Sequence, residues 1–189
     1  MFDAMRLVEE VNSQVLPEIH GGLQSLSMSE INGDHLSNGF SFERKMKKLL
    51  RSVYTKTDHI DRAPQNFIGS WPADYCLMWG EGEKKGSMFF YRKGKLVGEI
   101  DTLVHYHSGD YVVPIAFDFK LSGRFSAEFE SKLPRITDFL SKFYAAPICV
   151  CRVEPSPNMR NVGIMTDPRN PAYSTMVIPV KAKRPSYIQ

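Results

Sequence analysis

Hydrophobic residues recur at helical spacing in three stretches of the chain. In residues 2–17, in residues 40–54 and in residues 125–145, one apolar residue follows another at intervals of three or four, which predicts three amphipathic helices. The first stripe comprises Phe2, Met5, Val8, Val11 and Val15; the second Phe42, Met46, Leu49, Leu50 and Val53; the third Phe125, Phe129, Leu133, Ile136, Leu140 and Phe143. Pro134 lies inside the third helix and is expected to kink it or divide it in two.

Between the first two helices the pattern is lost. Residues 18–39 contain four glycines and several Ser and Asn residues, which predicts a loop with at most a brief helical turn near 28–32.

Strand-like segments fill the interval between the second and third helices. They span residues 73–79, 87–92, 96–107 and 111–121, and the last two flank a Ser108-Gly109-Asp110 turn that predicts a β-hairpin. After the third helix, residues 147–153 are apolar except for Arg152, as in a strand buried on both faces. Two further strands are expected near 162–165 and 175–180.

The resulting order is α-β-β-β-α-β, which predicts an α/β fold with a central mixed sheet flanked by helices. A chain of 189 residues suits one domain. We expect its core at about 40–153, a helical extension at 1–39, and C-terminal strands with a basic tail at 154–189.

Composition restricts the function only weakly. Hydrophobic residues make up 42% and charged residues 24%, as in ordinary globular proteins. The net charge of +3 permits a polyanionic partner without requiring one. The chain has no signal-peptide pattern and no apolar run of about 20 residues, so a soluble, cytoplasmic protein is expected.

The three cysteines are Cys76, Cys149 and Cys151. Their odd number and the lack of a CxxC spacing disfavour a disulfide framework or a zinc knuckle. Cys149 and Cys151 alternate along the apolar strand, where inert packing is expected.

Polar residues interrupt the predicted hairpin in a way that points to chemistry. Strand alternation places Glu99 and Asp101 on one face of the first strand, with Leu103, His105 and His107, and Ile100 on the other face with Thr102, Val104 and Tyr106. On the second strand, Asp118 and Lys120 share a face opposite Phe117 and Phe119. Pairing of the strands brings three carboxylates and one ammonium together.

Such a cluster suits hydrolysis of a phosphodiester. Clustered carboxylates repel one another unless a hard cation such as Mg²⁺ binds between them. That cation polarises the phosphate and lowers the pKa of an attacking water, and a lysine beside it can orient the water.

The segments Gly98-Glu99-Ile100-Asp101 and Phe117-Asp118-Phe119-Lys120 resemble the PD-(D/E)XK, or restriction-endonuclease-like, nuclease superfamily. The nearest members in pattern are the archaeal Holliday-junction resolvases and the nuclease-related domains. The resemblance covers about residues 40–153. In that superfamily a glutamate on the first core helix often completes the metal site, and Glu43 occupies the corresponding position.

This resemblance implies that Asp101, Asp118 and Glu43 bind the metal, that Lys120 serves the water, and that Glu99 assists. It departs from the usual pattern in having Ile100 in place of the proline and Asp118 as the less common acid. Asp74, in Pro72-Ala73-Asp74-Tyr75, is an alternative first metal ligand. We favour Asp101 because its strand is joined directly to that of Asp118.

Simpler interpretations exist for each of these features. The four hairpin residues can form surface salt bridges that contribute little. His105 and His107 are expected to be solvated side chains at the hairpin tip. The basic run on the second helix is commonly a solvated face, but it can also follow a nucleic-acid backbone. The candidate nucleic-acid-binding residues in that run are Arg44, Lys45, Lys47 and Lys48, and the tail at 181–184 is a further candidate.

The sequence therefore predicts a Mg²⁺- or Mn²⁺-dependent DNA endonuclease, acting on branched or structured DNA and forming a homodimer by analogy with the superfamily. Two alternatives stay open. One is a non-catalytic DNA-binding or assembly protein that keeps the nuclease fold, and the other is a phosphoesterase that acts on a different substrate.

Overall fold

The computed structural model describes residues 3–30, 39–62, 74–120, 126–156 and 162–179. Its first element is a long helix composed of α1 (Ala4–Glu10), the π-helical turn η1 (Val11–Val15) and α2 (Leu16–Glu30), which follow one another without a gap. Asp3 begins it by accepting a hydrogen bond from the backbone N–H of Arg6 at 3.1 Å.

The loop predicted from residue 18 is therefore wrong as far as residue 30, and residues 31–38 lie outside the described part of the chain. Ile19 and Leu23 are fully buried one helical turn apart, so they continue the apolar stripe of the first predicted helix. Met5 does not belong to that stripe, because 53% of it is exposed.

The second predicted helix is confirmed as α3 (Gly39–Tyr54). All five residues of its apolar stripe are buried. α3 packs against α2 so closely that a Cβ on Gly22 would lie 2.7 Å from Cγ2 of Val53.

The strands form two sheets. The first has six strands in the order β1 (Ile60–Arg62), β5 (Thr102–Ser108), β6 (Tyr111–Phe119), β7 (Cys149–Ser156), β9 (Asn170–Pro179), β8 (Gly163–Asp167). The second is antiparallel and contains β2 (Tyr75–Trp79), β3 (Met88–Arg92) and β4 (Lys95–Ile100), with the short 3₁₀ helix η3 (Gly82–Lys84) between β2 and β3.

The fold is thus α/β with a mixed sheet, as predicted, but the strands between residues 75 and 100 form a sheet of their own. The short strand β1 was not predicted.

β5 and β6 form the predicted antiparallel hairpin, and β7 runs parallel to β6. α4 (Ser126–Leu140) connects them and includes Pro134, so the predicted division of this helix is wrong. Cys149 and Cys151 are buried in β7 as expected.

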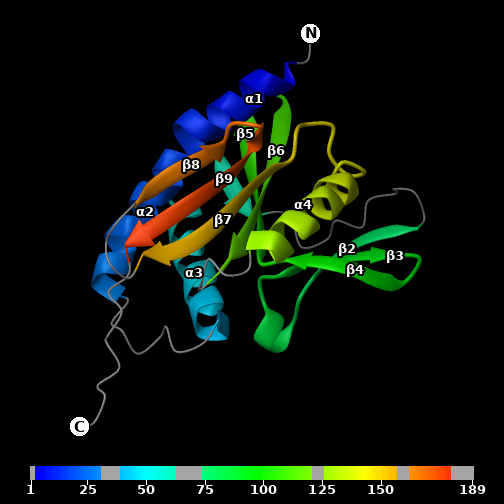
Figure 1. Ribbon diagram of the computed structural model, residues 1–189, viewed down its shortest axis with the longest axis horizontal. Coiled ribbons are helices and arrows are strands. Elements are labelled where there is room, and N and C mark those ends of the chain that lie inside the picture. The colour runs from blue at the N-terminus through cyan, green and yellow to red at the C-terminus, as the bar shows by residue number, and fades with distance from the viewer. Residues whose placement is uncertain (1–2, 31–38, 63–73, 121–125, 157–161, 180–189) are drawn as a thin grey trace.

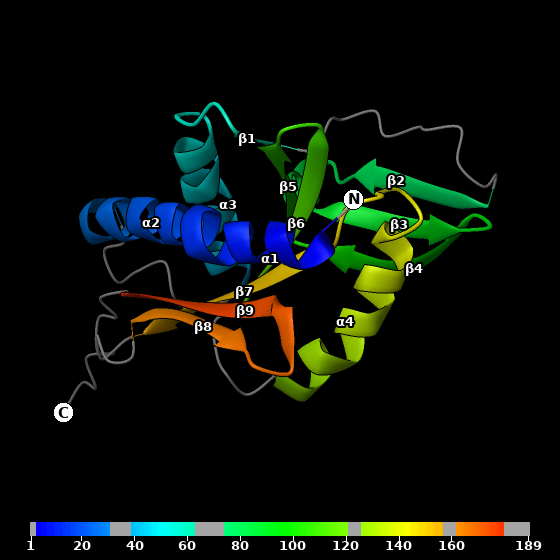
Figure 2. The same ribbon diagram turned by 90° about the horizontal axis from the view of Figure 1, so that it is seen from above.

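The N-terminal helix and α3 cover one face of the six-stranded sheet, and α4 and the second sheet cover the other (Figures 1 and 2). Apolar residues of the N-terminal helix and α3 pack on one face, against Val104, Val113 and Ile115. Residues of α4 and the three-stranded sheet pack on the other face, around Leu103 and Ala116. None of the described helices is long and apolar enough to cross a membrane.

The two sheets are continuous through a single residue. β4 ends at Ile100, β5 begins at Thr102, and Asp101 occupies the bend between them. The strand predicted over 96–107 is therefore broken at Asp101, the residue to which the resemblance assigned a metal-binding role.

Candidate functional site

Asp101 is fixed at the bend by two hydrogen bonds to β6. Its backbone N–H donates to the carbonyl of Phe117 at 3.1 Å, and its Oδ2 accepts from the backbone N–H of Phe119 at 2.6 Å. The side chain thus continues the pairing with β6 where the main chain turns away. The Asp101 side chain is buried, and the bond to Phe119 holds its carboxylate in one orientation.

Asp118 and Lys120 lie beside it at the end of β6. Lys120 Nζ is 3.2 Å from Oδ1 of Asp118, whose side chain is 5% exposed. The other carboxylate oxygen, Oδ2, has no hydrogen-bond partner among the described residues. A buried carboxylate oxygen without a partner is costly, and binding of a cation is one way to satisfy it.

Asp101 and Asp118 are close enough that the charge of one affects the pKa of the other. Burial, followed by the charges of Glu43 and Asp118, raises the pKa of Asp101 to about 7, against the opposing effects of the Phe119 N–H and the Lys120 charge. Burial also raises the pKa of Asp118, against the opposing effect of Lys120. Ionised carboxylates at this place therefore cost free energy unless positive charge compensates them.

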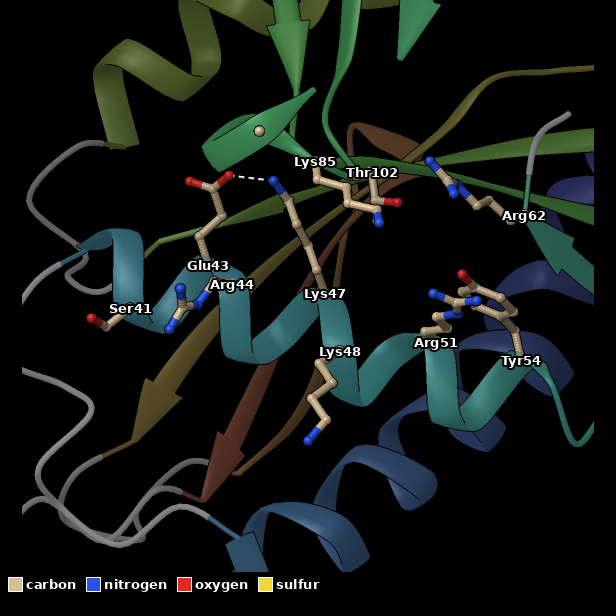
Figure 3. A pocket seen from close by; sticks show the side chains of 12 residues that line it. Ser41, Glu43, Arg44, Lys47, Lys48, Arg51, Tyr54, Arg62, Lys85 and Thr102 are labelled. Carbon is tan, nitrogen blue, oxygen red and sulfur yellow. Dashed lines mark hydrogen bonds and ion pairs between the residues drawn. The ribbon is translucent and has the colours of Figure 1, made fainter. Parts of the chain in front are cut away.

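Glu43 comes toward this cluster from the first turns of α3, close enough for its charge to act on Asp101. Its Oε1 forms an ion pair with Nζ of Lys47, which also donates to the buried hydroxyl of Ser87 at 2.7 Å. Figure 3 shows Glu43 and Lys47 turned toward one another along the helix. In this arrangement Lys47 occupies one oxygen that the resemblance assigned to a metal.

Glu99 is held by a lysine near the cluster. It pairs with Lys84 of η3 at 3.1 Å, and about a third of its side chain is exposed. The bend at Asp101 changes the strand alternation, so Ile100 and Leu103 contribute to the same hydrophobic cluster although they are three residues apart. The predicted grouping of Ile100 with Val104 and Tyr106 is therefore wrong.

Asp74, the alternative metal ligand, lies away from this cluster. It precedes β2 and forms an exposed ion pair with Lys93 at 3.8 Å. Because Tyr75 pairs with Arg92 whereas Ile100 pairs with Met88, Asp74 and Asp101 are at opposite ends of the three-stranded sheet.

The two buried aspartates provide the kind of donor that a hard divalent cation prefers. Across the described part of the chain no group of three or more His, Cys, Asp or Glu side chains is arranged to hold a metal. Mg²⁺ is commonly held by one or two carboxylates and completes its shell with water and substrate phosphates. Asp101 and Asp118 fit that mode, whereas Glu43 is held by Lys47.

A cationic cleft opens next to this cluster (Figure 3). It has a volume of about 710 Å³ and lies between α3, the loop at 82–86 and the start of β5. Of the predicted nucleic-acid-binding residues, Arg44, Lys47 and Lys48 line it, and Lys45 is not among the lining residues. The basic segment 181–184 lies outside the described residues.

The histidines of the hairpin differ from one another. His107 is exposed, as predicted, but His105 is buried, with Nε2 2.7 Å from the hydroxyl of Tyr144. The prediction of a solvated His105 is wrong because the segment after α4 covers that part of β5.

Several charged residues near the cluster had no signal in the sequence. Burial lowers the pKa of Lys84, but the hydrogen bond and charge of Glu99, with the charges of Glu43 and Asp101, outweigh it and raise the pKa overall. The charges of Lys132 from α4 and Arg152 from β7 act on Asp118. These residues reach the cluster from elements far apart in the sequence, so only the folded arrangement identifies them.

Comparisons with known protein families, curated proteins and solved structures found no match to this chain.

Proposed function

We propose that this protein is a metal-dependent nuclease that hydrolyses DNA phosphodiester bonds with Mg²⁺ or Mn²⁺, in the manner of the PD-(D/E)XK superfamily. The observation that carries the proposal is the buried pair Asp101 and Asp118, with Lys120 beside it and one Asp118 oxygen unpartnered among the described residues. A pair of salt bridges on the surface would not bury this oxygen or raise the pKa of both acids.

Each residue has a role that follows from its place. Asp101 and Asp118 would hold the cation, which when bound supplies polarisation of the phosphate and acidification of a water. Asp118 keeps the Lys120 ammonium at the cluster, where it can donate a hydrogen bond to a phosphate oxygen or orient the attacking water. The backbone N–H of Phe119 fixes the orientation of Asp101.

The order of the elements also supports the proposal. The helix α3 precedes the antiparallel β5–β6 hairpin, and α4 then leads to β7, which is parallel to β6. This order agrees with the core that the resemblance implies, with Asp118 on β6 and Asp101 at the bend that leads into the adjacent β5. A branched DNA substrate and a homodimer rest on the resemblance alone.

A second candidate is a DNA-binding or assembly protein with the same fold and no turnover. The ion pair between Glu43 and Lys47 favours it, because the helix glutamate is then engaged by a cation of the chain itself. A phosphoesterase acting on a small substrate would use the same two aspartates.

The test compares cleavage of labelled single-stranded, duplex and four-way DNA by the wild type, Asp118→Asn and Lys120→Ala, in Mg²⁺, in Mn²⁺ and in chelator. Asp118→Asn keeps the shape but removes a metal-binding charge, and Lys120→Ala removes the ammonium. Loss of such a group costs on the order of a thousandfold in rate. We expect cleavage by the wild type only with metal, and a loss of about that size in both variants.

The exposed pair Asp138 on α4 and Lys142 in the turn after it provides the matched controls, since its members are 3.4 Å apart and 73% and 39% exposed. Asp138→Asn and Lys142→Ala should cleave like the wild type. Equal cleavage by the site variants and these controls would refute the assignment of the site. DNA binding without cleavage by the wild type under every condition would instead favour the non-catalytic protein.

A further inference from the structure

The cationic cleft beside the carboxylate cluster has two walls and a charged lining. One wall is the face of α3 from Ser41 to Tyr54, which is about 15 Å long from Arg44 to the end of the helix. The other is the loop that carries Lys85, where Gly82 and Gly86 have φ angles of +56° and +96°. These positive φ angles allow the chain to turn back toward α3 at little cost.

Six basic side chains line the cleft: Arg44, Lys47, Lys48, Arg51, Arg62 and Lys85. Glu43 is the one acid among the residues that line it, and its charge is matched by Lys47. Within the described residues neither Arg51 nor Lys85 forms a salt bridge. The cleft therefore has five positive charges in excess, which is the electrostatic environment of a polyanion site.

An aromatic ring and two guanidinium groups lie at the end of the cleft away from Glu43. Tyr54 lines it, and burial raises the pKa of the Tyr54 hydroxyl despite the charges of Arg62 and Arg51 near it. The guanidinium of Arg62 lies over the ring of Trp79, 3.7 Å from its centroid. Figure 3 shows Arg51, Tyr54 and Arg62 gathered at this end, opposite Glu43. Planar guanidinium and aromatic groups are surfaces on which unpaired bases stack.

From these observations we infer that the cleft binds a single, unpaired polynucleotide strand, with its phosphates along α3 and a base at the Tyr54–Arg62 end. The inference rests on the proposed function and deepens it, because it names the form of substrate that enters the site. Two walls around a volume of about 710 Å³ enclose a ligand in the size range of small-molecule pockets, which suits a short piece of one strand. A duplex presents its phosphates to a protein surface and hides its bases, so it would leave the aromatic end unused.

The strand so placed leads directly to the carboxylate cluster. Glu43 lies at one end of the cleft and Thr102 lines it beside Lys85 (Figure 3), Thr102 follows Asp101 in the chain, and the charge of Glu43 acts on Asp101. A phosphate next to this end therefore meets the two aspartates. Unpaired ends, flaps and single-stranded stretches are then the expected sites of hydrolysis.

The test measures DNA binding in chelator, where metal-dependent cleavage cannot occur. The probes are a fluorescein-labelled 12-nucleotide oligothymidine and a blunt hairpin duplex with the same number of phosphates, and fluorescence anisotropy is recorded over a range of salt concentrations. We expect the single strand to bind at least tenfold more tightly. Arg51→Gln and Arg62→Gln should each weaken its binding about three- to tenfold and lower the salt slope by about one.

Arg169→Gln is the matched control, because Arg169 is exposed in the turn between β8 and β9, at the edge of the six-stranded sheet opposite β1. Its binding should equal that of the wild type. Since Arg62 contacts Trp79, its variant is also checked by thermal unfolding, and the exposed Arg51 keeps the test valid if Arg62→Gln is unstable. Equal or tighter binding of the duplex would overturn the inference, as would cleft variants that bind like Arg169→Gln.

Failure of this inference can be separated from failure of the proposed nuclease activity. If the wild type cuts DNA and the cleft variants cut single strands at the normal rate, the inference is wrong and the nuclease stands. If the single strand binds through the cleft and nothing is cut in Mg²⁺ or Mn²⁺, the inference stands and the nuclease proposal fails.

Discussion

At the scale of single residues, His105 is enclosed where a solvated side chain was expected. Its Nε2 lies 2.7 Å from the Tyr144 hydroxyl, and its Nδ1 faces Asp61 at 3.7 Å. Burial, with a smaller effect of the His107 charge, lowers the pKa of His105 to about 4 against the opposing charge of Asp61. The neutral ring is therefore the form that the fold accommodates.

We predict that His105 makes the protein sensitive to acid between pH 6.5 and pH 4. The unfolded chain binds a proton at His105 near pH 6.5, whereas the folded chain does so only near pH 4, so the free energy of unfolding falls as the pH drops through this range. A shift of this size corresponds to roughly 3 kcal/mol. His105→Gln removes the effect and should flatten the pH dependence in urea unfolding, whereas exposed His107→Gln should not. An unchanged acid slope in His105→Gln would contradict the prediction.

The chemistry of the site was predictable from sequence where neighbouring residues determine it. Asp118 and Lys120 are two residues apart on one strand, so they share a face, and the structure places them 3.2 Å apart. Ile100 was wrongly grouped with Val104 and Tyr106 because the same alternation was extended through Asp101, where the chain bends from one sheet into the other. His105 was misjudged because the burial of a hairpin residue depends on what packs over it.

At the scale of elements, the helix α2 shows why a glycine pair misled the prediction of a loop. Gly22 faces α3, and the absence of its Cβ is what allows the two helices to approach. Around Gly21 nothing lies within 4 Å of an added Cβ. A sequence shows only that a residue is glycine, whereas the reason for it lies in the neighbouring helix.

We therefore predict opposite effects for alanine at these adjacent positions. Gly21→Ala should stabilise the protein by about 0.5–1 kcal/mol, because alanine favours the helix and meets no neighbour. Gly22→Ala gains the same propensity but places its Cβ 2.7 Å from Cγ2 of Val53, a β-branched side chain with little rotational freedom. Its net effect should be a loss of about 1–3 kcal/mol. Denaturant unfolding of both variants measures the difference, and equal stabilities would show that the helices separate freely.

At the scale of the whole molecule, the order of helices and strands was largely predictable. The division into two sheets and the packing of the N-terminal helix into the hydrophobic core were not. Strand pairing over long separations, such as β1 with β5, leaves no local pattern. The segment 1–39 was expected to be an extension of the core at 40–153. Instead its buried side chains belong to the same hydrophobic cluster as β6, β7 and β9.

We predict that removing residues 1–30 abolishes cooperative folding. Seven apolar side chains of this segment are at most 4% exposed: Leu7, Val8, Val11, Val15, Leu16, Ile19 and Leu23. Burying each contributes about 1.5–3 kcal/mol, so together they contribute roughly 10–20 kcal/mol, which is as large as the whole stability of a typical domain. The chain 31–189 should show no cooperative transition in thermal or urea unfolding followed by circular dichroism.

Two point variants measure how much single side chains of this helix contribute to the free energy of unfolding. Leu23→Ala should lower the free energy of unfolding by about 2–5 kcal/mol, because it leaves a cavity under the helix. Met5→Ala, on an exposed side chain of the same helix, should change it by less than about 0.5 kcal/mol. A cooperative transition in 31–189 close to that of the full chain would mean that the six-stranded sheet is stable with α3 as the helix left on that face. The helix would then be an appendage, and the boundary predicted near residue 40 would hold after all.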